Sequence, residues 1–168
     1  RRQIINNSKN TFPLHTRLKN TMHIFERSIS IKATPKVVFD FHTNVENIIK
    51  ITPPGIKVTI IHADPPKLGQ EVILRVKQFG ILTSTMHMKF VEFEAPHVLS
   101  DRQVKGIFKS LFQRRTFTEQ SNGTTLLTDR FEYELPFGIL GRIVQKLFVG
   151  KIVEKMFTHR QKITKELI

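Results

Sequence analysis

Three side chains in the second half of the chain could take part in acid–base chemistry: Asp101, Asp129 and Tyr133. Two carboxylates beside a phenol can donate and accept protons at a polarised carbonyl group. Arg115 lies between the two aspartates in sequence, and a neighbouring arginine keeps carboxylates ionised, which works against a general-acid role. We therefore treat the three side chains as catalytic candidates, with a purely structural ion pair as the alternative.

The hairpin between the last two predicted strands sets the geometry of this cluster. Ser121-Asn122-Gly123 is typical of a three-residue loop with glycine in the left-handed position, so Gln120 and Thr124 close the hairpin. The resulting register places Arg115 opposite Asp129, Gln113 opposite Phe131, and Leu111 opposite Tyr133. These residues share one apolar face with Phe117 and Leu127, and the final helix should cover that face.

The covered face of the sheet should therefore combine a large apolar area with a polar cluster. The members of that cluster are Arg27, Asp101, Gln103, Gln113, Arg115, Asp129 and Tyr133. Charges on a covered face must pair or meet water, because an unpaired buried charge is costly. We expect Arg115 to pair with Asp129 and to share that contact with Asp101.

The histidines do not point to a metal site. The chain has seven of them without metal-ligand spacing, and it has no cysteine. His87 should face solvent from its strand, and His159 should lie on the apolar side of the final helix. No phosphate-binding loop, nucleophile elbow or dinucleotide fingerprint occurs, so we expect neither a metal nor a cofactor.

The spacing of apolar residues predicts how these side chains are positioned. Residues 24–32 alternate as a strand, with Arg27 on the same side as Phe25 and Ile29. Thr34-Pro35 opens a helical segment that continues to about Lys50, as one or two short helices. Six more strands follow as a meander, with a bulge after Phe90: residues 56–62, 70–79, 82–93, 98–104, 108–120 and 124–135.

Residues 135–168 are predicted to form a turn and then one long amphipathic helix. Some 27 helical residues would reach roughly 40 Å, so the apolar stripe must pack against the sheet. That stripe contains Leu140, Ile143, Val144, Leu147, Phe148, Ile152, Met156, Ile163 and Leu167. The apolar residues of its two halves point in different directions around the helix, and the direction changes at Gly150. We interpret residues 136–148 as a movable lid and the helix from Lys151 onward as a fixed clamp.

Composition limits the class of protein. A chain of 168 residues with 14 Phe suits one domain, from residue 22 to 168, and no run of about 18 apolar residues could span a bilayer. Residues 1–21 carry five basic and no acidic residues, so we expect a disordered leader, either an organellar presequence or a stretch upstream of a natural start at Met22. The net charge of +13 serves solubility or attracts acidic surfaces, and no nucleic-acid motif appears.

Several stretches resemble a known superfamily over residues 24–160. They are Phe25-Glu26-Arg27-Ser28-Ile29, Val38-Phe39-Asp40-Phe41-His42-Thr43, Ile51-Thr52-Pro53-Pro54, Asp101-Arg102-Gln103 with Gly106 and Phe108, Asp129 through Tyr133-Glu134-Leu135-Pro136 to Gly141, and Met156-Phe157-Thr158-His159-Arg160. The chain resembles the START-like (SRPBCC) superfamily, which includes birch-pollen-allergen-like and polyketide cyclase/dehydratase-like proteins. It is most similar there to the bacterial ligand-binding group.

The resemblance implies an α+β helix-grip fold, in which a seven-stranded curved antiparallel sheet wraps around a long C-terminal helix. It also implies an elongated cavity for apolar ligands, with catalysis in only some members. This chain has Met86 or Thr85, and again Leu111, where that group tends to have Trp. Gln113 and Arg115 stand where it tends to have a pair of His, which weakens an enzymatic reading and favours a softer cavity.

We therefore expect a carrier of a lipid-like or polyketide-like molecule. Apolar contacts should come from Phe41, Met86, Met88, Leu111, Phe117, Phe131, Phe137 and Phe148. The polar end of the ligand should meet Arg115, Gln113 or Tyr133, with Arg27 and Gln103 nearby. The alternatives are a solid core without a ligand, a cyclase or dehydratase, and an adaptor that binds an acidic partner or a membrane surface. We expect a cytoplasmic monomer or weak homodimer.

Overall fold

The computed structural model describes residues 22–78, 80–136 and 148–168. The predicted leader (residues 1–21) lies outside the described residues, as does most of the predicted lid (residues 136–148).

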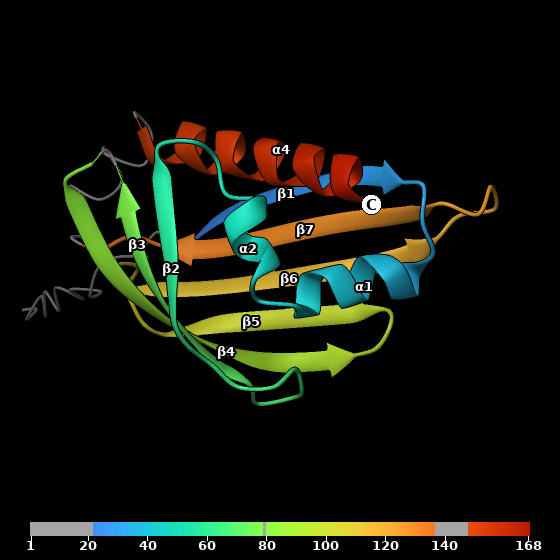
Figure 1. Ribbon diagram of the computed structural model, residues 1–168. Coiled ribbons are helices and arrows are strands. Elements are labelled where there is room, and N and C mark those ends of the chain that lie inside the picture. The colour runs from blue at the N-terminus through green and yellow to red at the C-terminus, as the bar shows by residue number, and fades with distance from the viewer. Residues whose placement is uncertain (1–21, 79, 137–147) are drawn as a thin grey trace, which may run out of the picture.

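The core of the structure is one antiparallel sheet (Figure 1). Its strands are β1 (His23–Ile31), β2 (Ile56–Ala63), β3 (Glu71–Gln78), β4 (Leu82–Glu94), β5 (Val98–Lys105), β6 (Ser110–Glu119) and β7 (Thr125–Glu134). They lie in the order β1-β7-β6-β5-β4-β3-β2, so β2 to β7 form a continuous meander and β1 joins at the β7 edge. The predicted class, a seven-stranded antiparallel sheet that curves around a C-terminal helix, is confirmed.

The predicted register of the last hairpin is also confirmed. Arg115 lies opposite Asp129, Gln113 opposite Phe131, and Leu111 opposite Tyr133. The Gln120 N–H donates to the Thr124 carbonyl oxygen at 2.8 Å, and Gly123 adopts φ 75°, which only glycine reaches without strain. A bulge follows Phe90 as predicted, whereas the shifts at His87/Met88 and Ile60/His62 were not foreseen.

Two short helices follow β1 and lie over the sheet: α1 (Pro35–Thr43) and α2 (Asn47–Lys50). The prediction of one or two short helices between Thr34 and Lys50 is confirmed. Asn44 breaks the run, because it takes an extended backbone and its side-chain oxygen accepts the Glu46 N–H at 3.1 Å. The Asn47 side chain then donates to the Phe41 carbonyl oxygen at 2.8 Å, which ties α2 back to α1.

The C-terminal helix α4 (Gly150–Leu167) packs beside β1 (Figure 1) and buries a different face from the predicted one. Its buried residues are Val153, Phe157, Gln161 and Thr164, whereas Leu167 is 52% exposed. The predicted stripe of Ile152, Met156, Ile163 and Leu167 is therefore displaced by one residue, or about 100°. The cause is Gln161, whose amide donates to Asp129 Oδ2 at 2.8 Å and to the Arg27 carbonyl oxygen at 3.0 Å.

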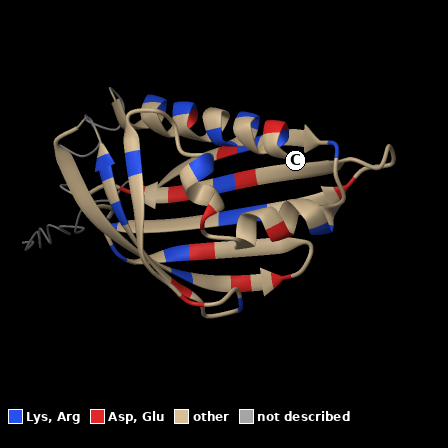
Figure 2. Cartoon of the chain, viewed as in Figure 1, with Lys and Arg blue, Asp and Glu red and all other residues tan. Residues whose placement is uncertain are grey.

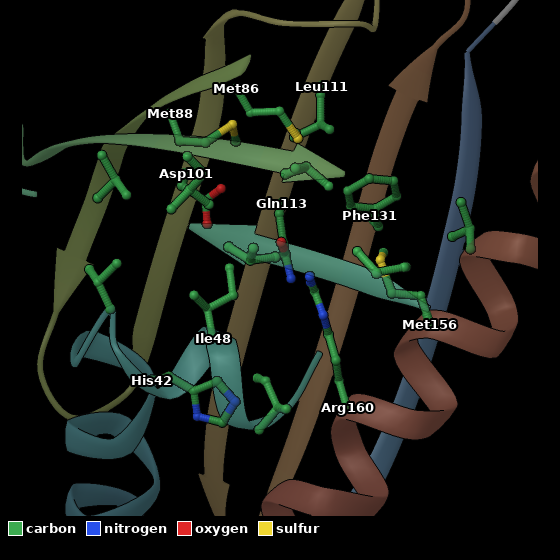
Figure 3. A pocket seen from close by; sticks show the side chains of 18 of the residues that line it. His42, Ile48, Met86, Met88, Asp101, Leu111, Gln113, Phe131, Met156 and Arg160 are labelled. Atoms are coloured by element: carbon green, nitrogen blue, oxygen red, sulfur yellow. The ribbon is translucent and has the colours of Figure 1, made fainter. Parts of the chain in front are cut away.

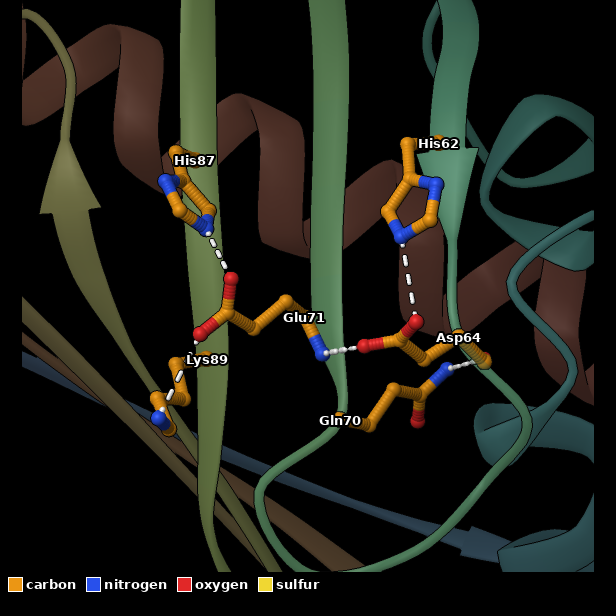
Figure 4. Close-up of polar contacts among 6 residues, drawn as sticks. All are labelled: His62, Asp64, Gln70, Glu71, His87 and Lys89. Carbon is orange, nitrogen blue, oxygen red and sulfur yellow. Dashed lines mark hydrogen bonds and ion pairs between the residues drawn. The ribbon is translucent and has the colours of Figure 1, made fainter.

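The outer face of β2, β3 and β4 carries a separate polar network (Figure 4). Glu71 contacts His87 at 2.9 Å and Lys89 at 3.3 Å, and these two contacts hold the pKa of its carboxyl below the ordinary value. Asp64 accepts the Glu71 N–H at 3.0 Å and lies 3.1 Å from His62, and both contacts lower its pKa. His87 thus points away from the core as predicted, and the network fastens three neighbouring strands.

Two groups of buried side chains fill the inner face. One lies under α1 and contains Ile31, Val38, Phe39, Leu99, Phe117 and Leu127 among others. The other lies under α4 and contains Met88, Leu111, Phe131, Tyr133, Val153 and Phe157. Members of both groups reach the cavity described below.

Replacing Gln161 should test whether this amide fixes the position of α4 on the sheet. We expect Gln161→Ala to lower the free energy of unfolding by about 1–3 kcal/mol, because Asp129 loses a donor in a buried setting. Lys162→Ala, one residue along at an exposed position, is the matched control. Urea denaturation monitored by circular dichroism measures both, and equal midpoints for the two variants would contradict the prediction.

Candidate functional site

A cavity of about 290 Å³ lies between the sheet, the two short helices and α4 (Figure 3). Alternation along the strands turns every second side chain toward it. Its apolar walls come from the sheet (Val58, Val72, Leu74, Val76, Met86, Met88, Leu111, Phe131), from the α1–α2 region (Phe41, Val45, Ile48, Ile51) and from the start of α4 (Val149, Ile152, Val153, Met156). The space is therefore lined mostly by aliphatic and thioether groups.

One end of the cavity is polar and is organised by Arg115. Its Nη1 lies 3.3 Å from Asp101 Oδ1 and its Nε lies 3.3 Å from Asp129 Oδ1. The side chains of all three residues are at least 86% buried. Gln113 donates to Asp129 Oδ1 at 3.4 Å. The predicted pairing of Arg115 with Asp129, shared with Asp101, is confirmed.

Burial raises the pKa of the Asp101 carboxyl above its ordinary value, although Arg115 and Arg160 act in the opposite direction. The prediction that Arg115 keeps Asp101 ionised is therefore wrong in the direction of the pKa shift, because it rested on the arginine alone. Loss of water around the carboxylate is the larger effect at this site.

His42 on α1 also lines the cavity, and the sequence analysis did not select it. Its Nδ1 lies 2.8 Å from the Val38 carbonyl oxygen, and since a carbonyl only accepts, Nδ1 carries the hydrogen. Burial, followed by the charge of Arg115, lowers the pKa of His42 to about 4. The ring is neutral at pH 7, with Nε2 as an acceptor. Its position one turn after Val38, an expected inward residue, could have revealed it.

Arg160 on α4 reaches the same end of the cavity (Figure 3). Burial and the nearby Arg115 lower its pKa to about 10, so the guanidinium stays positive at neutral pH. Its charged group lies 5.8 Å from the centre of the Phe157 ring, and its Nε is buried without a hydrogen-bond partner. Arg160 was not among the predicted site residues, although it lies one helical turn after Met156, which was expected on the apolar stripe.

The structure brings together eight of the predicted site residues around the cavity. They are Phe41, Met86, Met88, Asp101, Leu111, Gln113, Arg115 and Phe131.

The other predicted residues lie elsewhere. Phe117 and Tyr133 are buried in the packed core, where aromatic neighbours surround them. Gln103 donates to the Phe108 carbonyl oxygen at 2.8 Å, and Asp129 lies behind Arg115, outside the lining of the cavity.

Arg27 and Phe148 do not line the cavity either, since both are exposed, and Phe137 lies outside the described residues. Of the three catalytic candidates, only Asp101 therefore borders the cavity. Arg27 contributes its backbone oxygen, which accepts a hydrogen bond from Gln161, while the residue itself is exposed.

Within the described ranges no three His, Asp or Glu side chains gather in a way that could hold a metal ion. No helix in the same ranges is long and apolar enough to cross a membrane.

Comparisons with known proteins place this cavity in context. The family model for polyketide cyclase/dehydrase and lipid transport matches residues 22–166. Comparison with curated proteins gives no match. More than two hundred solved chains match in structure.

Three of the similar structures illustrate the range. A START superfamily protein from Mycobacterium smegmatis is 16% identical with a TM-score of 0.66, and the match covers 87% of this chain and 97% of the other. Ginseng major latex-like protein 151 from Panax ginseng is 14% identical with a TM-score of 0.64 and the same coverage. The di-domain ARO/CYC BexL of the BE-7585A biosynthetic pathway is 17% identical with a TM-score of 0.67, over 87% of this chain and 50% of that one.

The lowered pKa of His42 predicts a specific pH dependence of stability. The unfolded chain binds this proton at the ordinary value of 6.5 and the folded chain only at about 4. The stability contributed by neutral His42 is therefore complete above pH 6.5 and is lost as the pH falls toward 4, by at most about 3 kcal/mol.

We expect the free energy of unfolding to fall less steeply over this interval in His42→Gln than in the wild type. Chemical denaturation at a series of pH values measures the free energy of unfolding of both proteins. Parallel curves for the two proteins would contradict the assignment.

Proposed function

The chain belongs to the polyketide cyclase/dehydrase and lipid transport family of the START-like superfamily, and from this premise we propose that residues 22–168 bind and carry a hydrophobic small molecule. The main support is the cavity of about 290 Å³ with its aliphatic and methionine walls. Ligand pockets in proteins are typically apolar hollows of roughly this size or larger, with a few polar groups at defined points.

The size of the cavity argues against a solid core. A space of about 290 Å³ is many times larger than the space that one water molecule needs. Protein interiors are otherwise closely packed, so a space of this size is more typical of a ligand pocket than of a packed core.

The methionines suit a carrier more than a site of precise geometry. Met86, Met88 and Met156 face the cavity from β4 and α4. Their unbranched side chains change conformation at little cost and adapt to ligands of different outline. The walls therefore support retention of an apolar body without strict selection of its shape.

Contact with an acidic partner or membrane surface is a lesser part of the proposal. The exposed side of α4 carries Lys151, Lys155, Lys162 and Lys165, against Glu154 and Glu166 (Figure 2). Four positive charges less two negative charges leave only +2, so the attraction is modest. The cytoplasmic location and the monomeric or weakly dimeric state stay predictions.

A cyclase or dehydratase activity is the second candidate, favoured by one observation. Neutral His42 and Asp101, whose carboxyl has a raised pKa, both border the cavity. A proton acceptor and a proton donor could thus face the same substrate. Asp129 and Tyr133 do not border this space and would have no direct part in such a reaction.

Filling the cavity should abolish binding of an apolar probe. We expect Met156→Trp to weaken binding of Nile red, a neutral dye, by about tenfold or more, because the larger ring occupies the ligand space. Ile61→Trp, at a position on β2 that is 47% exposed, is the matched control and should bind like the wild type. Fluorescence titration measures both. Equal affinity in the two variants, or no binding by the wild type, would refute the carrier proposal.

The enzymatic alternative makes a different prediction. If a polyketide-like substrate is turned over, His42→Phe and Asp101→Asn should each lower kcat about a hundredfold. Tyr133→Phe should change it little, because Tyr133 lies in the packed core. Product formation followed by liquid chromatography tests this, and a loss confined to Tyr133→Phe would reject the assignment.

A further inference from the structure

The polar end of the cavity contains two arginines but only one of them is paired. Arg115 contacts both nearby carboxylates, at 3.3 Å each. Asp129 has its remaining oxygen bound by the Gln161 amide at 2.8 Å. Among the described residues no carboxylate lies within ion-pair distance of Arg160, which is held only over the Phe157 ring. Arg160 is thus a cation at the cavity without an acidic partner.

A second, smaller void next to the main cavity borders part of the Arg160 side chain. The buried Arg160 Nε, Gln161 Oε1 and Thr164 Oγ1 have no hydrogen-bond partner, and all three residues line a void of about 10 Å³. Such a space accommodates about one water molecule and no ligand group. The guanidinium can therefore meet a ligand only from the main cavity, which Arg160 also lines.

We propose that the ligand is an amphipathic monoanion, an apolar body with a carboxylate head that binds Arg160 while the body lies among the methionine and aliphatic walls. This inference rests on the proposed carrier function. A buried guanidinium without a partner is costly, and a carboxylate is the group that matches its planar set of donors with two parallel hydrogen bonds. Among the described residues, Arg160 is the arginine at this site without a carboxylate within ion-pair distance, so the head should bind there.

The surrounding charges fit a carboxylate better than a larger anion. With both aspartates ionised, two arginines and two carboxylates sum to zero, and protonation of Asp101 leaves +1. A single negative head therefore brings the net charge of the site to between −1 and 0. A dianionic phosphate would bring it to between −2 and −1, a larger excess of negative charge in a buried place. Asp101 and Asp129 both oppose the head, and Asp101 is the one that borders the cavity, so its removal should favour binding.

A matched pair of ligands distinguishes binding of the charged head from binding of the apolar chain. Decanoate and decanol share an apolar chain and differ in the charged group. We expect the wild type at neutral pH to bind decanoate about tenfold or more tightly than decanol, measured by displacement of Nile red. Arg160→Met should remove this preference and leave the affinity for decanol unchanged. Asp101→Asn should strengthen binding of decanoate alone.

Lys162→Met is the matched control, because it removes the same net charge from the same helix at a position whose side chain is 71% exposed. It should retain the preference for decanoate, which excludes general attraction to a basic protein. Arg160→Gln serves as a second variant if Arg160→Met does not fold, as judged by circular dichroism.

The outcomes distinguish this inference from the carrier function. If Nile red binds and decanoate shows no preference over decanol, or if the preference survives in the Arg160 variants, the anionic head is refuted and the carrier function stands. If the wild type binds neither Nile red nor either decyl ligand, the carrier function fails, and this inference fails with it.

Discussion

The contact on which the rest of the structure depends is Arg115 between Asp101 and Asp129. It joins three adjacent strands on their covered face, since the residues belong to β6, β5 and β7. A buried charge without a partner costs several kcal/mol, so none of the three can leave its position independently. The amide of Gln161 extends the network to α4. The polar centre of an otherwise apolar face thus determines where the helix docks.

The docking of α4 then decides which side chains meet the cavity. With Gln161 directed at Asp129, the buried face runs through Val153, Phe157 and Thr164. The adjacent face, with Ile152, Met156 and Arg160, is left to border the open space. A helix seated by its apolar residues alone would have turned Ile163 and Leu167 inward. The ion-pair network therefore both stabilises the sheet and shapes the cavity.

The features that could be predicted from the sequence are those set by residues close together in the chain. Alternation and the Gly123 turn determine the strands and the hairpin register, and with them Leu111, Gln113, Arg115 and Phe131. The face of α4 could not be read from hydropathy, because a glutamine is buried there for partners more than thirty residues away. The position of the break between α1 and α2 could not be predicted, because the Asx turn at Asn44 competes with the helix through a single side chain.

The protonation states favour retention of a molecule over its conversion. An efficient general base has a pKa near the working pH, and His42 at about 4 lies well below it. Where relatives tend to place a pair of histidines, Gln113 and Arg115 are occupied by contacts with Asp101 and Asp129 and so are not free to move protons. His42 offers an acceptor nitrogen at the cavity and Arg160 a cation. Under the proposed carrier function, this pair would orient a polar head while the apolar walls accommodate what is attached.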